Sequence, residues 1–551
     1  MSSSSHILIN RPADPSRFAT GQVAGISPCE AVTGTFAHLK APRISHPVNI
    51  MGRPSAAGFP RSPIAARRRL ALATGLGAAE KLGDDEGVNY FAVMLDNEKD
   101  DDDTPRENKD YKAVLALEKG IIKLLANFIK KHSGCSSRKA SSEAKALFNT
   151  SSKDVLNNLD WNTVEDSFRF RGTHFNSTLI PAGQIKLGDQ DIFAAGYANK
   201  GISSKSNEET THAMNMWIST FYAGDDNRDP LFSGIRHGVL SPFGLKAGSA
   251  ERQQGALNRA REVAAAALFL HPEKLAAALA GQTVVLPLTS TSLLTPVDIG
   301  PSTEESQFRD QMEAWEKLGA GPVEIPIRNE KGEMVRVTLR LDIAAFNFGV
   351  NELALKRLHL GHNTAGAYNR SALVKLLGKD LSPGSAHGGW VGQYLASRPD
   401  NADRVSSLAS ELKQIWAKKT YRADKGEPYK AAVRVALLSH EIGITPCWNC
   451  KSGKDRTGIM DAVIKHQAVS QYLRKTDADS VLPDAENKTL MQKVMLNSGN
   501  MQIQQHNAGV PGNKCLKNNK IFNFLFGKLT LRRSIGDKRI ADQAEGFSKY
   551  V

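Results

Sequence analysis

The 551-residue chain is 41% hydrophobic, 23% charged and 7% aromatic, a composition that excludes a wholly disordered or fibrous protein. Its length allows about three or four domains, and its longest apolar runs are about half as long as a bilayer-spanning helix requires. The 71 lysines and arginines outnumber the 57 acidic residues and give a net charge of +14, which favours nucleic acid, anionic lipid or phosphorylated small molecules as partners. Five scattered cysteines exclude a disulfide scaffold and predict a reduced working compartment.

The first 107 residues predict a region without a stable fold. Prolines recur from Pro12 to Pro63, and residues 1–79 contain only two acidic residues. Residues 96–103 then form a dense acidic block, which we interpret as a solvated linker because like charges repel. The amino terminus lacks a basic segment followed by a long apolar one, so ordinary signal-peptide export is not predicted and another export route stays open.

An amphipathic helix is predicted over residues 111–131, with Asp110 as its capping residue. Apolar side chains recur on one face of this helix: Val114, Leu117, Ile121, Leu125 and Phe128. We expect this apolar stripe either to pack inside a helical domain or to fit the groove of a partner. Helical character continues through residues 141–159, and we assign residues 108–200 to a helical domain.

Residues 201–551 predict an α/β domain in which helices flank a central sheet. A strand is expected over residues 283–288, and alternating apolar and polar residues predict a hairpin with its turn at Gly332. The strands of this hairpin cover residues 323–328 and 334–341. The predicted helices cover residues 251–270, 273–280, 404–417, 429–440 and 459–473.

The segment that carries chemistry contains Cys450 and, after five intervening residues, Arg456. A loop of this length between a strand and a helix amino terminus can curl its amides around one tetrahedral oxyanion, with Ser452 and Gly453 allowing tight turns. Cys450 then serves as a thiolate nucleophile, Arg456 clamps two phosphoryl oxygens, and Thr457 hydrogen-bonds to the sulfur as it leaves. The pattern predicts phosphatase chemistry, against the alternative of an inert buried cysteine.

Two lysines inside the same loop bear on specificity. Lys451 and Lys454 place cations where a substrate with several phosphates would carry further charge. A single phosphotyrosine would use them less. The competing interpretation is that both are solvated surface charges.

The same loop region contains a C-x-x-C pair, Cys447 and Cys450, so zinc and redox chemistry must be weighed. A zinc site needs two further ligands at similar local spacing, but there is no second cysteine pair and His440 stands alone. We expect Cys447 to pack in the core, or to form a disulfide with oxidised Cys450 that protects it. No metal and no cofactor are predicted.

Two segments resemble a known family: residues 449–458, Asn-Cys-Lys-Ser-Gly-Lys-Asp-Arg-Thr-Gly, and residues 346–352, Phe-Asn-Phe-Gly-Val-Asn-Glu. They resemble the type III secreted inositol phosphate phosphatase effectors of the SopB/SigD/IpgD family. The resemblance implies a cysteine phosphatase that acts on phosphoinositides and inositol polyphosphates in the host cytosol and at the inner face of host membranes. It also implies a secretion chaperone for the region 1–107, a helical region that binds the host cell division control GTPase of the Rho family, contact with an anionic membrane surface, and no nucleic-acid partner.

The resemblance makes Cys450 the nucleophile and Arg456 the phosphate clamp, and it leaves the proton donor open. Asp455 could protonate the leaving oxygen, or it could only buttress Arg456 while Asp342 or Asp298 supplies the acid. Asn347 and Asn351 match the other motif, and they either bind substrate or shape one wall of the pocket. Asn449 stands where ordinary tyrosine phosphatases have histidine, which puts the usual activation of the thiol in doubt.

Three functions therefore compete. The first is a lipid and inositol phosphate phosphatase delivered into host cells. The second is a protein tyrosine phosphatase, which the two loop lysines disfavour. The third is a GTPase-binding effector whose phosphatase activity is secondary.

Overall fold

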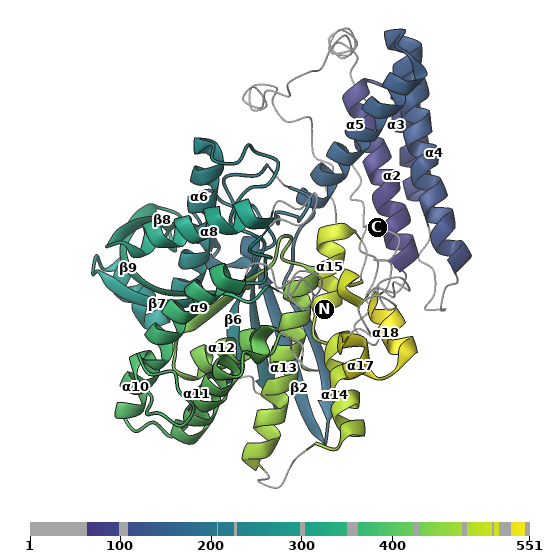
Figure 1. Cartoon of the computed structure of the whole chain (residues 1–551). Helices are drawn as coiled ribbons and strands as arrows, with labels where there is room; N and C mark the ends of the chain where they lie inside the picture. The colour runs from purple at the N-terminus through teal and green to yellow at the C-terminus, as the bar shows by residue number, and fades with distance from the viewer. Residues whose placement is uncertain are drawn as a thin grey trace. The chain divides into compact units, whose positions relative to one another are not determined.

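The computed structural model of the chain has two compact units (Figure 1). The structure describes residues 63–98, 108–206, 208–224, 229–297, 304–349, 362–422, 427, 429–476, 482–509, 512–516 and 530–545. We call the described residues up to Trp161, together with residues 505–509, the helical unit. Those from Asn162 to Gln504, together with residues 512–545, are the sheet unit. None of the described helices is long and apolar enough to cross a lipid bilayer.

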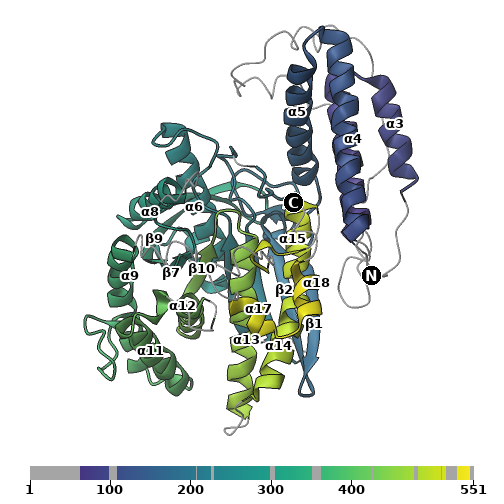
Figure 2. The same cartoon turned by 45° about the vertical axis from the view of Figure 1, so that its right-hand side comes forward.

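The helical unit contains four helices before residue 162: α2 Pro63–Leu82, α3 Asp85–Asp96, α4 Asn108–Ser133 and α5 Ser137–Asn157. α2 contacts each of the other three, and α4 also contacts α5 (Figure 2). The predicted helix at 111–131 is confirmed, although it begins before Asp110, which therefore does not cap it. Val114, Ile121 and Leu125 are buried, so the apolar stripe packs inside this unit.

The expectation of disorder up to residue 107 is wrong for residues 63–98, which form α2 and α3. The Ala- and Leu-rich run of α2 is buried against its neighbours, and the virtual Cβ of Gly75 would lie 3.0 Å from both Ile121 and Phe91. The basic character of this segment is accommodated, because Arg67 forms an ion pair of 2.5 Å with Glu118. The predicted disorder of residues 1–62, and most of the predicted acidic linker, lie outside the described residues.

The core of the sheet unit is an eight-stranded sheet with the order β1-β2-β5-β6-β10-β7-β9-β8. β10 pairs in parallel with β6 and β7, and β7 pairs in parallel with β9, whereas the remaining pairs are antiparallel. The strands are β1 Val164–Phe170, β2 Thr173–Pro181, β5 Trp217–Ala223, β6 Pro230–His237, β7 Val284–Ser292, β8 Val323–Arg328, β9 Met334–Asn347 and β10 Thr445–Asn449; β3 Lys186–Leu187 and β4 Gln190–Asp191 form a separate small hairpin.

The expected boundary between domains at residue 200 is also wrong. β1 and β2 belong to the sheet, and the division falls between Trp161 and Asn162. Side chains of β1 alternate strictly between buried and exposed, which is the period of a strand and not of a helix. The predicted hairpin of β8 and β9 is confirmed, with Gly332 at φ +78° in its turn.

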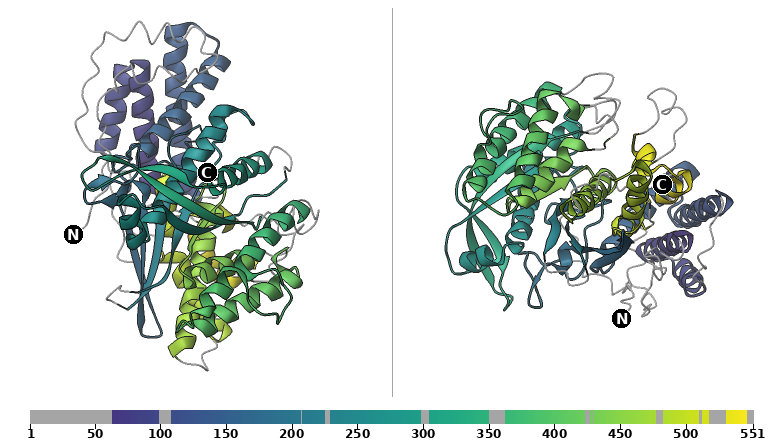
Figure 3. Two further views of the ribbon diagram at one scale, coloured as in Figure 1. Left: turned by 90° about the vertical axis from the view of Figure 1, so that its left-hand side faces the viewer. Right: turned by 90° about the horizontal axis from the view of Figure 1, so that it is seen from below.

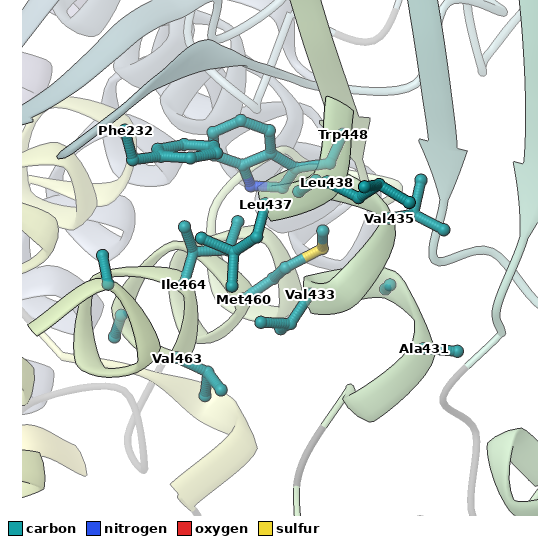
Figure 4. Packing of buried hydrophobic residues seen from close by; sticks show 14 of the residues in the cluster. Phe232, Ala431, Val433, Val435, Leu437, Leu438, Trp448, Met460, Val463 and Ile464 are labelled. Atoms are coloured by element: carbon teal, nitrogen blue, oxygen red, sulfur yellow. The ribbon is translucent and has the colours of Figure 1, made fainter. Parts of the chain in front are cut away.

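Two groups of helices cover the two faces of this sheet, which confirms the expected α/β class (Figure 3). One face packs on α6 Ala250–Phe269, α7 Pro272–Leu279 and α8 Glu304–Gly319. The other packs on a core in which Phe232 and Trp448 meet α12 and α13 (Figure 4). The elements on that side are α9 His362–Leu377, α10 Gly389–Ala396, α11 Ala402–Ala417, α12 Lys430–Glu441, α13 Asp455–Thr476, α14 Asp484–Leu496, α17 Thr530–Ile535 and α18 Lys538–Glu545; α15 Asn500–Ala508 and the short helices η2 Ala182–Gln184, η4 Thr420–Arg422 and η5 Lys514–Leu516 complete the described set.

Candidate active site

The Cys450 loop, residues 450–454, joins β10 to the amino terminus of α13 as the spacing predicts. It lies at the carboxyl end of the parallel strands, where α/β sheets usually bind ligands. Four strands end there in register, because Asn449 pairs with both His237 and Ser292, and Ser292 pairs with Asn347. Asn347 of one sequence motif and Asn449 of the other, which are 102 positions apart (449 minus 347), therefore lie at the same end of the sheet.

Every backbone carbonyl of the Cys450 loop accepts a hydrogen bond. Two of the donors are local: the amide of Gly453 donates to Cys450 O at 3.3 Å, and the amide of Gly458 donates to Lys454 O at 2.9 Å. The other three come from distant segments: Val239 N donates to Lys451 O (3.2 Å), Asn215 Nδ2 to Ser452 O (3.1 Å) and Arg236 Nη2 to Gly453 O (3.3 Å). These contacts hold the carbonyl oxygens in place as acceptors of protein donors.

The backbone amides of the loop are used differently. The amide of Cys450 donates to Thr457 Oγ1 at 2.9 Å. Within the described part of the chain, no atom accepts a hydrogen bond from the amides of Lys451, Ser452, Lys454, Asp455 or Arg456. Free amides in a loop that opens a helix form an anion-binding concavity, and the helix dipole adds positive potential there. We call this set of amides the anion cradle.

Gly453 is required by the geometry of the loop. Its φ is +66°, a left-handed conformation that residues with a Cβ rarely adopt. A Cβ at this position would also lie 2.6 Å from Gly238 N and from the carbonyl carbon of His237, both of which are backbone atoms. The end of β6 thus presses directly against the loop.

Cys450 and Cys447 point to opposite faces of the sheet. Cys450 is 1% exposed and packs with Trp448 on the side of α12 and α13, whereas Cys447 packs on the side of α6. The expected protective disulfide between them is therefore wrong, and the alternative that Cys447 packs in the core is what the structure has. Burial raises the pKa of the Cys447 thiol. His440 contacts Ser233 N and Pro230 O with its two ring nitrogens, and no described group of three or more His, Cys, Asp or Glu residues is placed to hold a metal ion.

Arg456 forms a bidentate ion pair with Glu304, the first residue of α8. Its Nη2 donates to Glu304 Oε1 at 2.5 Å, and its Nη1 donates to Glu304 Oε2 at 3.1 Å and to Leu293 O at 2.7 Å. Burial alone would lower the pKa of Arg456, but the charges of Glu304 and Cys450 raise it. Burial likewise opposes the charge of Glu304, yet the charge and hydrogen bonds of Arg456 lower its pKa. Glu304 was missed by the sequence analysis, since no local pattern connects residues so far apart.

Asp455 lies at the amino terminus of α13 and is fixed by the carboxyl-terminal segment. Its Oδ1 accepts the amide of Lys514 at 2.8 Å, and its Oδ2 lies 3.7 Å from Lys454 Nζ. The backbone oxygen of Asp455 also accepts a hydrogen bond from Asn513 Nδ2 at 2.9 Å. These contacts are compatible with a buttress, and they leave the Oδ2 atom beside a cation in the loop.

The other two candidate acids fare differently. Asp342 lies in β9 opposite Pro287, five residues before the pair Ser292–Asn347, or about 16 Å along the strands from the site edge. It forms an ion pair of 2.6 Å with Lys375 and accepts a hydrogen bond from Trp390 Nε1. Asp342 is therefore excluded as the acid. Asp298 and Asn351 lie outside the described residues.

The remaining polar candidates take distinct positions. Asn347 is 1% exposed, and its Nδ2 donates to Leu294 O at 3.0 Å, so it ties the end of β9 to the segment that follows β7. Asn449 exchanges two hydrogen bonds of 2.9 Å with Gln311 of α8, which commits its side chain away from the thiol. Thr457 is buried and accepts the Cys450 amide.

The two loop lysines are partly buried. Lys451 Nζ lies 5.1 Å from the ring centroid of Phe243, and Lys454 faces Asp455. The carbonyl oxygen of Ser452 accepts a hydrogen bond from Asn215 Nδ2. Both lysines are therefore partly buried and make contacts with neighbouring side chains, so neither is a simple solvated charge.

Similarity to known proteins extends over most of the chain. The inositol phosphate phosphatase SopB of Salmonella typhi is 41% identical over 481 residues, which cover 86% of this chain and 84% of that protein. The inositol phosphate phosphatase IpgD of Shigella flexneri is 41% identical over 404 residues, 72% of this chain and 73% of that protein. The solved structure of SidF, a Legionella phosphoinositide phosphatase, shares the fold with a TM-score of 0.53 at 11% identity, covering 88% of this chain and 93% of that one. A family model described as "Enterobacterial virulence protein IpgD" matches residues 64–551, and the chain therefore belongs to this family, as its two motifs predict.

Proposed function

We propose that this chain is an inositol phosphate phosphatase that works through a cysteinyl-phosphate intermediate. The observation that carries the proposal is the anion cradle. Its free amides belong to the loop that contains Cys450 and leads into Arg456, while every carbonyl of this loop accepts a hydrogen bond from another protein donor. Such a loop favours a tetrahedral anion with several acceptor oxygens. The names of the relatives, inositol phosphate phosphatases, support the class of substrate.

The first chemical step transfers the phosphoryl group to the enzyme. The Cys450 thiolate attacks phosphorus, the P–O ester bond breaks, and the leaving alkoxide takes a proton from Asp455. Arg456 turns its fork from the Glu304 carboxylate to two phosphoryl oxygens, and the amides of the cradle neutralise the developing charge.

The second step returns the enzyme to its starting state. Water attacks the phosphorus of the thiophosphate, the P–S bond breaks, and inorganic phosphate and the Cys450 thiolate are released. Asp455, now a carboxylate, accepts a proton from this water. Thr457 Oγ1 accepts a hydrogen bond from the Cys450 amide, so the hydroxyl hydrogen of Thr457 is left to stabilise the sulfur as a leaving group.

Lys451 and Lys454 support phosphoinositides and inositol polyphosphates over phosphotyrosine. Both are partly buried residues of the Cys450 loop, where phosphates on neighbouring ring positions would contact them. The membership of the family supports delivery of the chain through a type III system, with a secretion chaperone, to the host cytosol and the anionic inner face of host membranes.

The test is phosphate release from purified full-length protein against phosphoinositides, inositol polyphosphates and phosphotyrosine peptides. Cys450→Ser should abolish turnover and leave the thermal melting curve unchanged, because serine has similar volume but lacks a base to activate it. Substantial residual turnover by that variant would end the cysteine mechanism. A preference for phosphotyrosine peptides would instead favour the tyrosine phosphatase alternative.

We also propose that the helical unit binds the host cell division control GTPase. The unit is compact, and it exposes three large apolar side chains, Tyr90, Val93 and Leu124, that its own core does not bury. Binding should therefore be lost in Leu124→Glu or Val93→Glu of the full chain and kept in Cys450→Ser. Wild-type protein with no affinity for the GTPase in either nucleotide state would remove this role and leave the helices as a scaffold.

A further inference from the structure

Arg236 is a buried cation next to the Cys450 loop that the mechanism above does not use. It is the penultimate residue of β6, and its backbone pairs with Trp448 of β10 on one side and Trp217 of β5 on the other. Paired residues of adjacent strands point to the same face, so Arg236 lies on the face that carries Trp448 and Cys450. Its side chain is fully buried.

The guanidinium lies beneath the loop and the first turn of α13. Nη2 donates to the carbonyl of Gly453 at 3.3 Å, and Nη1 donates to Asn500 Oδ1. A Cβ built on Gly458 would lie 3.4 Å from Nη2, which places the group directly against the helix backbone. The absence of a side chain at Gly458 thus gives the guanidinium its space.

Two buried cations share one carboxylate in this region. Asp461 Oδ2 lies 3.9 Å from Arg236 Nη1 and 2.8 Å from Lys465 Nζ, and all three side chains are fully buried. Asp461 also accepts hydrogen bonds from Ser219 Oγ and Asn500 Nδ2, each at 2.7 Å. A second carboxylate, Asp166 of β1, also interacts with Lys465, whereas Asp461 is the carboxylate paired with Arg236.

The charge on Arg236 is coupled to the site. Burial lowers the pKa of Arg236, while the charges of Asp461 and Cys450 raise it. A buried arginine with an incomplete set of partners is costly, and a purely structural contact between β6 and α13 does not need a charge. The charge lies against the carbonyl of Gly453, three residues after the nucleophile.

We propose that Arg236 is a positioning residue of the phosphatase site, which keeps the Gly453 carbonyl out of the anion cradle and stabilises the Cys450 thiolate from below. The catalytic part of this inference rests on the proposed function. The electrostatic part does not, since it concerns the state of Cys450 before any substrate binds.

The experiment measures the pH dependence of alkylation of Cys450 by iodoacetamide in the full-length protein, with fragment ions that distinguish Cys450 from Cys447. Arg236→Gln should move the midpoint of this dependence upward by about one pH unit, which is a tenfold loss of thiolate below the midpoint. Arg236→Lys keeps the charge but not the fork, so it should leave the midpoint near that of wild type and lower kcat for phosphate release. If Arg236 had only a structural role, the midpoint of Arg236→Gln would stay at the wild-type value.

Asp461→Asn supplies a second variant with the opposite sign. It is nearly isosteric and removes the carboxylate that lies 3.9 Å from Arg236, so the midpoint should fall. Arg434→Gln is the matched control: Arg434 is a largely buried arginine of α12 that pairs with Glu411 and Glu427, and its loss should leave the midpoint unchanged.

An unchanged midpoint in folded Arg236→Gln, as judged by circular dichroism, overturns the inference. If that variant does not fold, an unchanged or raised midpoint in Asp461→Asn overturns it instead. A wild-type protein in which Cys450 shows no alkylation below the pH typical of a free thiol would argue against the proposed function itself, which separates the two failures.

Discussion

Gly453→Ala is the sharpest test of the Cys450 loop, because its effect follows from two features of the backbone geometry. The φ of +66° costs an alanine about 1–2 kcal/mol. The new Cβ would lie 2.6 Å from Gly238 N, whereas ordinary contact begins at 3.4 Å, so the loop must move by about 0.8 Å (3.4 minus 2.6). A misplacement of about 1 Å at a reacting centre costs roughly a hundredfold in rate. We therefore expect kcat/KM to fall about a hundredfold, which is about 2.7 kcal/mol in activation free energy.

A matched control isolates the clash from the backbone cost. Gly443 precedes β10 with a φ of +70°, and a Cβ there would meet nothing within 4 Å. Gly443→Ala should lose about 1–2 kcal/mol of stability and keep its activity. Both variants are assayed by thermal unfolding and by hydrolysis of an inositol polyphosphate. If Gly453→Ala loses no more activity than Gly443→Ala, the contact between β6 and the loop does not set the geometry of the cradle.

Four further predictions concern the side chains around the cradle. Asp455→Asn should slow inositol phosphates far more than aryl phosphates, whose leaving oxygen needs little protonation; equal losses would make Asp455 a buttress. Lys451→Ala or Lys454→Ala should reduce turnover of multiply phosphorylated substrates more than of a simple aryl phosphate, and a uniform loss would show that the lysines only maintain the loop. Glu304→Gln should bind orthovanadate about tenfold more tightly, because the carboxylate no longer competes for Arg456; weaker binding would show that Glu304 orients Arg456 instead. The pKa of Glu304 is lowered in the folded state. The stabilisation that the Glu304 carboxylate gives is therefore complete above the ordinary carboxyl pKa and is lost as the pH falls through the lowered value. The difference in Tm between wild type and Glu304→Gln should shrink over the same fall in pH.

The local part of the site could be predicted from the sequence because its signals are contiguous. Residues 445–476 contain the strand, the turn residues and the helix within one stretch, and the structure has them in that order. The opposite orientation of Cys447 and Cys450 also follows from their odd spacing along a strand. This spacing is incompatible with the disulfide hypothesis. The α/β class and the hairpin at Gly332 were confirmed on the same local grounds.

The partners that fix the site could not be predicted, because they come from distant segments. Glu304 is 152 positions from Arg456, and Arg236 is 217 positions from Gly453. Nothing in the local sequence of either residue differs from that of an ordinary surface charge. At the amino-terminal end, the prolines and the basic run predict disorder, but the Ala- and Leu-rich run of α2 forms a helix. The burial of this run depends on three other helices, which its own sequence does not reveal.

The core of the helical unit is completed by residues that the ribosome adds 441 positions after Arg67. Arg67 Nη1 donates to Ala508 O at 3.0 Å across 441 positions, and the rings of Trp161 and His506 pack 5.3 Å apart. A nascent or truncated chain that ends before residue 505 therefore presents the core of these helices incomplete. The helices therefore cannot complete their core before the sheet unit is made, because residues 505–509 follow residues 162–504 in the chain.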